Sequence, residues 1–129
     1  MDFLGIKPST TMRGQKAEDA ALAYLQRQGL KLVERNYRTP GRGGGEIDLI
    51  LRDRDGSLVF VEVRSRNTDR FGGAGASIGQ GKRQRIVLAA RHYLMKFVAM
   101  PACRFDVVLV DTSEGKSAVE WLKGAFDAM

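Results

Sequence analysis

Hydrophobic positions recur with helical spacing near the start of the chain and with strand-like spacing after it. Apolar residues three and four apart predict a helix over residues 12–28, and Gly29 stands where that helix would end. A looser alternation of apolar and polar residues predicts a strand over residues 30–37. Residues 39–45 contain one proline and four glycines, which indicates a loop.

The middle of the chain predicts a β-hairpin. Residues 46–51 and 58–65 are rich in β-branched and other apolar residues, which favours two strands. The pair Asp55-Gly56 lies between them, and Asp-Gly between two apolar segments is typical of a tight turn.

The second half of the chain predicts a helix followed by one or two strands. We expect a helix from about residue 80 to residue 98, with Ser77 and Gln80 as its capping box. The continuous apolar segment 105–110 predicts a strand that is covered on both faces, and residues 119–122 a further short edge strand. The order α-β-β-β-α-β predicts an α/β fold with a mixed β-sheet flanked by helices.

Length and composition restrict the class of protein. The 129 residues are 43% hydrophobic and 28% charged, which suits one globular domain over residues 1–129. The single cysteine, Cys103, excludes an intramolecular disulfide and a multi-cysteine zinc site, and we expect it to be buried. No apolar segment approaches the roughly 20 residues of a membrane span, and the first residues show no secretory signal. We therefore expect a cytoplasmic protein that does not bind membranes.

Charge is unevenly distributed around a net value of +6. Residues 46–63 contain five acidic and two basic side chains, whereas residues 64–104 contain nine basic side chains and one acidic. A basic segment attracts the phosphates of nucleic acid, and an acidic cluster beside it suits a divalent metal ion. A solvated basic surface without a ligand is the other interpretation of this pattern.

Two carboxylates stand inside the predicted hairpin. Side chains alternate across a strand, so Glu62 faces away from the valines on either side of it, and Asp48 stands on the neighbouring strand. Carboxylates this close repel each other, and a shared Mg²⁺ would remove the repulsion. The alternative is a structural ion pair between Glu62 and Arg64 or Arg52.

The segments around these carboxylates resemble a known family. GEIDLI at residues 45–50, FVEVRSR at residues 60–66 and the helix around Lys82 and Arg83 are similar to the small bacterial YraN-like proteins of the PD-(D/E)XK nuclease superfamily. The resemblance covers nearly the whole chain, from Gly14 to Phe126. It implies a restriction-endonuclease-like fold and hydrolysis of phosphodiester bonds with Mg²⁺ or Mn²⁺.

The resemblance also implies roles for single residues. Asp48 matches the metal-binding aspartate, Glu62 the acidic residue of the E-x-K pair, and Glu18 a helix glutamate that some members, Holliday-junction resolvases among them, add to the metal site. Arg64 stands at the catalytic lysine position, where it would grip a phosphate but cannot act as a base. Glu46 is a further candidate for the metal site. The residues expected to bind the nucleic-acid backbone are Lys82, Arg83, Arg85 and Arg66.

Three function classes follow from these features. The first is a metal-dependent DNA endonuclease, which the resemblance extends to branched DNA. The second is a nucleic-acid-binding module that keeps the fold without turnover, and the third is an interaction domain for an acidic protein. The three carboxylates favour the enzyme, whereas Arg64 favours the binding module. The sequence leaves open whether the protein is a homodimer and whether Trp121 packs or stacks on bases.

Overall fold

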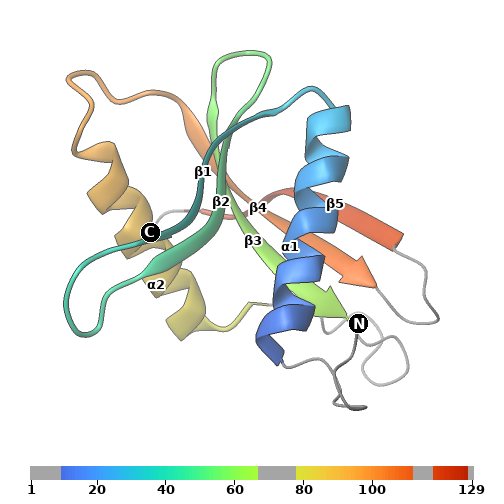
Figure 1. Ribbon diagram of the computed structural model, residues 1–129. Coiled ribbons are helices and arrows are strands. Elements are labelled where there is room, and N and C mark those ends of the chain that lie inside the picture. Colours follow the sequence, from blue (N-terminus) through green and yellow to red (C-terminus); the bar gives the residue numbers. More distant parts are fainter. Residues whose placement is uncertain (1–9, 67–77, 112–117, 128–129) are drawn as a thin grey trace.

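Two helices lie on opposite faces of one twisted sheet (Figure 1). The computed structural model describes residues 10–66, 78–111 and 118–127. Its helices are α1 (Thr10–Arg27) and α2 (Gln80–Leu94). Its strands are β1 (Lys31–Arg38), β2 (Glu46–Arg52), β3 (Leu58–Arg66), β4 (Cys103–Asp111) and β5 (Ala118–Phe126).

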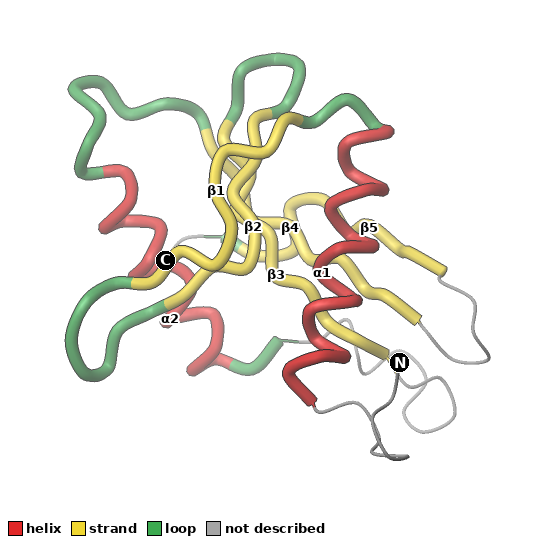
Figure 2. The backbone as a smooth tube through the Cα atoms, viewed as in Figure 1, coloured by secondary structure: helices red, strands yellow, loops and turns green. Residues whose placement is uncertain are grey.

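The strands are hydrogen-bonded in the order β1-β2-β3-β4-β5 (Figure 2). The pairs β1–β2, β2–β3 and β4–β5 are antiparallel, whereas β3 and β4 are parallel. A parallel pair needs a crossover connection, and α2 lies in the connection between β3 and β4. The predicted α/β class, the mixed sheet and the hairpin of β2 and β3 are confirmed.

The last strand is longer than the sequence predicts. Instead of a short strand at residues 119–122, β5 has nine residues and ends at Phe126. Its register against β4 shifts, so three residues of β5 stand opposite Asp106 alone. One of these is Gly124, whose φ of 59° is a conformation that glycine adopts readily. The resulting bulge interrupts the alternation of apolar and polar residues, which is why the pattern predicts too short a strand.

Each helix covers its own hydrophobic core. Small and apolar residues of α1 pack against one face of the sheet, namely Ala17, Ala21 and Leu25. Residues of α2 pack against the other face, among them Ile86, Ala90 and Tyr93. Within β3, Val59 and Val61 face α1 while Phe60 faces α2, so the alternation turns Glu62 toward α2. Neither α1 nor α2 has the length and hydrophobicity needed to cross a membrane.

The ends of α2 differ from the prediction. Its N-cap residue, Gly79, makes no side-chain capping bond, and Ser77 of the expected capping box lies outside the described residues. The helix ends at Leu94 rather than near residue 98. The N–H groups of residues 95–97 bind carbonyls only three residues back, so the chain tightens into a turn that does not continue the α-helix.

Candidate functional site

Asp48 and Glu62 meet where the pairing of β2 with β3 ends. The last backbone pair of this ladder joins Leu49 to Val61. Beyond it, the N–H of Val63 donates to Oδ2 of Asp48 at 2.8 Å. If the pairing of β2 with β3 continued, a backbone carbonyl would accept this hydrogen bond, and here the Asp48 side chain accepts it instead. The bond holds the Asp48 carboxylate within hydrogen-bonding distance of Glu62.

Glu62 is a buried carboxylate whose charge is poorly compensated. Its side chain faces α2, and the residue is only 7% exposed. Burial, and then repulsion by Asp48, raise the pKa of Glu62 to about 8, although the positive charges of Lys82 and Arg64 oppose this rise. Within the described part of the chain, Glu62 Oε1 has no hydrogen-bond partner. A buried polar atom of this kind requires an explanation, and an ion is one of the usual ones.

The pKa of Asp48 is raised as well. Burial is the main cause, and the bond from the Val63 N–H and a hydrogen bond shared with Glu62 oppose it. Two adjacent carboxyl groups cannot both ionise at low cost, so the pair favours either a proton or a cation between them.

Lys82 is the residue of α2 that reaches this pair. Its Nζ lies 3.6 Å from Oε2 of Glu62. Its positive charge lowers the pKa of both Glu62 and Asp48. Lys82 therefore lies at the carboxylate site. From the sequence alone, it was expected to contact the nucleic-acid backbone.

The neighbouring arginines of α2 point elsewhere. Arg85 Nη2 lies 3.9 Å from Oε1 of Glu46 at the start of β2. The Arg83 guanidinium lies 5.6 Å from the ring centroid of Phe126, at the end of β5. The three basic residues expected to act as one surface thus serve three different places on the molecule.

Gly45 sets how closely α2 approaches β2. A Cβ atom at Gly45 would lie 1.8 Å from the carbonyl oxygen of Arg85, so any side chain there would collide with the backbone of α2. Two bonds hold the residue in place: its N–H donates to Thr39 Oγ1 at 2.8 Å, and its carbonyl accepts from the Thr39 N–H at 3.0 Å. This role is not evident from the sequence pattern, although the segment GEIDLI begins with Gly45.

Glu18 lies on α1 near the pair without joining it. Burial, and then repulsion by Asp48, raise the pKa of Glu18, while Arg35 lowers it. Arg35 Nη2 lies 3.5 Å from Glu18 Oε1 and 2.8 Å from Asp19 Oδ1. No group of three or more His, Cys, Asp or Glu side chains suited to a metal ion occurs among residues 10–66, 78–111 and 118–127. Asp48 and Glu62 are therefore the core of the site, and direct metal ligation by Glu18 stays a prediction.

The other predicted arginines lie on or next to β3. Arg64 is half-buried two residues beyond Glu62. The Arg66 side chain lies outside the described part of the structure. Arg52, one of the alternative partners for Glu62, donates instead to the carbonyl of Gly56 at 2.8 Å.

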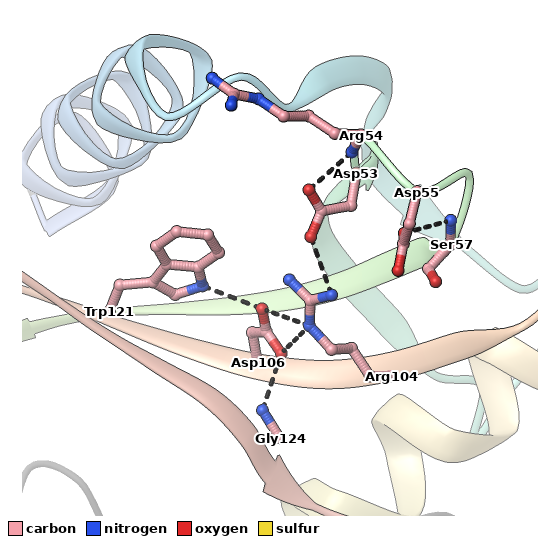
Figure 3. A network of polar contacts seen from close by, with 8 residues as sticks. All are labelled: Asp53, Arg54, Asp55, Ser57, Arg104, Asp106, Trp121 and Gly124. Atoms are coloured by element: carbon pink, nitrogen blue, oxygen red, sulfur yellow. Dashed lines mark hydrogen bonds and ion pairs between the residues drawn. The ribbon is translucent and has the colours of Figure 1, made fainter.

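A second buried carboxylate, Asp106, lies on the other face of the sheet (Figure 3). It accepts bonds from Trp121 Nε1 and from the Gly124 N–H, both at 2.9 Å. Arg104 Nε lies 3.1 and 3.2 Å from its two oxygens, and Arg104 Nη1 reaches Asp53 at 2.9 Å. Asp106 thus connects β4, the bulge of β5 and the hairpin turn, a role that the sequence pattern did not reveal.

The structure places two further residues, Trp121 and Cys103. Trp121 is half-buried and packs edge-on against Tyr24 of α1, with ring centroids 6.3 Å apart, so it is a packing residue. Cys103 is exposed, and the expectation that it is buried was wrong. It is the first residue of β4, just outside the part of that strand that the helices cover.

The fold and the site define a small α/β protein with two adjacent carboxylates, Asp48 and Glu62, where the pairing of β2 with β3 ends. A lysine of the following helix, Lys82, lies beside these carboxylates. The chain belongs to the uncharacterised protein family UPF0102, which it matches over residues 17–110. A UPF0102 protein of Paracidovorax citrulli is 66% identical over 122 residues, which cover 95% of this chain and 87% of the relative. A UPF0102 protein of Acidovorax sp. is 61% identical over 99% of both chains. The crystal structure of SSO0001 aligns with this chain at 13% sequence identity and a TM-score of 0.47. The alignment covers 92% of this chain and 54% of the SSO0001 chain.

Proposed function

We propose that this protein hydrolyses phosphodiester bonds in DNA, with a divalent metal ion held by Asp48 and Glu62. The observation that carries the proposal is the buried, mutually repelling pair, in which Glu62 Oε1 has no hydrogen-bond partner among the described residues. Carboxylate oxygens suit Mg²⁺ and Mn²⁺, and Mg²⁺ commonly takes only one or two protein carboxylates beside water and phosphate. Two carboxylates without a third therefore fit this metal.

The side chains around the pair suit this chemistry. A bound Mg²⁺ or Mn²⁺ would acidify a water molecule and neutralise charge on the phosphate. Lys82 favours the ionised carboxylates that a metal requires, because it lowers the pKa of both. Arg64 would hold the phosphate through two parallel hydrogen bonds, and it cannot accept a proton. Glu18 would assist through water.

Cleavage of linear, nicked and four-way-branched DNA with Mg²⁺ or Mn²⁺ tests the proposal. We expect metal-dependent cleavage that Asp48→Asn lowers about 100-fold or more, because a metal ligand matters at least as much as a residue that supports one. The matched control is Asp55→Asn, which removes the same charge from the exposed hairpin turn and should retain activity. Wild-type protein that cuts none of the three substrates with either metal would contradict the proposal.

Arg64 favours a second candidate, a nucleic-acid-binding module without turnover. Its guanidinium can grip phosphate but cannot replace a lysine in proton transfer. Arg64→Lys decides between the candidates in the same assay. Cleavage that is kept or increased supports the enzyme, whereas binding without cleavage by both proteins supports the module.

A further inference from the structure

A groove with a volume of about 540 Å³ lies between α2 and the end of β5. Asp48, Glu62 and Lys82 do not line it, so it is distinct from the carboxylate site. Val87 and Phe126 are buried side chains that form its apolar lining together with Leu88, which is 46% exposed. A leucine this exposed beside a hollow is available to a ligand.

The charged groups of the groove favour an anion. Arg83 and Arg91 both line it, and eight residues of helix separate them, which is about 12 Å along the axis of α2. Asp127 is the one acidic residue among the described residues that line the groove. The groove therefore combines an apolar lining with positive charge toward both ends.

We propose that this groove binds an unpaired nucleotide of the DNA substrate, an inference that rests on the proposed function. Sites for single-stranded nucleic acid combine basic groups along the backbone with apolar or aromatic surfaces for the bases. The arginines would contact phosphates, the apolar lining would cover a base, and the amides of Gln80 and Gln84 would meet its polar edge. The volume lies within the roughly 300–1,000 Å³ typical of small-ligand pockets, and a duplex is far too wide for it.

The position of the groove connects it with the carboxylate pair. Lys82, beside Glu62, and Arg83, in the groove, are consecutive residues of α2 whose side chains point to different sides of the helix. Consecutive side chains project about 100° apart around an α-helix, so the two sites lie on adjacent sides of α2. A duplex with a single-stranded tail or a branch could occupy both sites, whereas a blunt duplex would reach only the first.

Fluorescence anisotropy in EDTA, with a tailed duplex and the same duplex with blunt ends, tests the groove. We expect wild type to prefer the tailed DNA, and Leu88→Glu and Gln84→Glu each to weaken binding of the tailed DNA about tenfold. Both residues are exposed, so neither change removes core packing. The matched control is Val33→Glu, which adds the same charge at a residue of β1 that is 42% exposed, and it should behave as wild type. A tail of abasic nucleotides should lose the preference.

Four results would overturn the inference. The groove would not be the nucleotide site if wild type showed no preference for the tailed DNA, or if both groove variants kept that preference. The proposed function would be unaffected by either result. A wild-type dimer that Leu88→Glu dissociates in light scattering would assign the groove to a second copy of the chain. Failure of wild type to bind any DNA would overturn the inference and the proposed function together.

Discussion

Asp106 and the Asp48–Glu62 pair are both buried carboxylates, and their surroundings differ. Asp106 is fully buried and receives bonds from Arg104, the Trp121 indole and a backbone N–H, so each of its oxygens has partners. Glu62 is almost as buried, yet one of its oxygens has no partner in the described structure, and a second carboxylate lies beside it.

This difference is the one expected between a structural carboxylate and a carboxylate that binds a ligand, as we propose for Glu62. The bonds to Asp106 offset the cost of its burial, so its removal should affect folding. Burial and mutual repulsion make the ionised Asp48–Glu62 pair unfavourable in the protein without a bound ion. Stability therefore does not explain why these two carboxylates lie together. The local sequence does not distinguish the two sites, because Glu62 and Asp106 each stand between two apolar residues of a strand.

The largest effect is expected for Asp106→Ala. The change leaves Arg104, the Trp121 indole N–H and the Gly124 N–H without their acceptor, and we expect a loss of about 3–5 kcal/mol in the free energy of unfolding. Urea unfolding measures it. A loss below that of an ordinary surface substitution would show that the network does not support the fold and would remove the contrast between the sites.

An intermediate effect is expected for Gly45→Ala. The new methyl group would displace α2 from β2, at a cost of about 1–3 kcal/mol. The displacement should also weaken metal binding, because Lys82 would move away from Glu62. Calorimetry with Mn²⁺ and urea unfolding measure the two effects.

Gly14→Ala provides the control for that change. Gly14 lies within α1, and the methyl group of an alanine there would have no atom within 4 Å outside its own helix backbone and chain neighbours. Alanine should therefore raise stability by about 0.5–1 kcal/mol. If both glycine variants changed stability in the same direction, the close approach of α2 would not explain the result.

The most specific effect is expected for Glu62→Gln in metal-free buffer. The pKa of Glu62 is about 8 in the folded protein and near 4.5 when unfolded, so the folded state holds the proton more tightly. The contribution of Glu62 to stability is therefore fully present below pH 4.5 and is lost as the pH rises through about 8. Between pH 6 and pH 8 we expect wild type to lose about 2 kcal/mol more than Glu62→Gln, which has no proton to lose.

Urea unfolding in EDTA at both pH values measures this difference, and added Mg²⁺ should reduce it for wild type. Position 62 is surrounded by the charges of Asp48, Lys82 and Arg64 in both proteins. The comparison of wild type with Glu62→Gln therefore isolates the effect of the charge on Glu62. A Glu62→Gln variant that loses several kcal/mol at pH 8 would instead make Glu62 half of a structural ion pair.

Local pattern was enough to predict the hairpin and its two carboxylates. Alternation along β3 turns Glu62 away from the valines, and the Asp-Gly turn fixes which strand Asp48 faces. These features depend on residues close together in the sequence, so simple periodicity captures them.

Contacts between distant segments could not be predicted. Lys82 reaches Glu62 while Arg83 points to Phe126, because the packing of α2 on β2 decides which side of the helix meets the carboxylates. The length of β5 depends on a bulge that Asp106 stabilises from another strand. Cys103 is exposed because β4 begins beyond the cover of the helices.

The bulge opposite Asp106 also bears on aggregation. β5 is one of the two edge strands of the described sheet, and a flat, regular edge can recruit strands from other molecules. The left-handed conformation at Gly124 disrupts this edge, and the exposed charged residues Glu120 and Lys123 lie just before it. Holding the Gly124 N–H on a buried carboxylate turns that donor inward, away from any approaching strand. The hydrogen bonds to Asp106 that hold β5 in place thus also disfavour pairing of this edge with another strand.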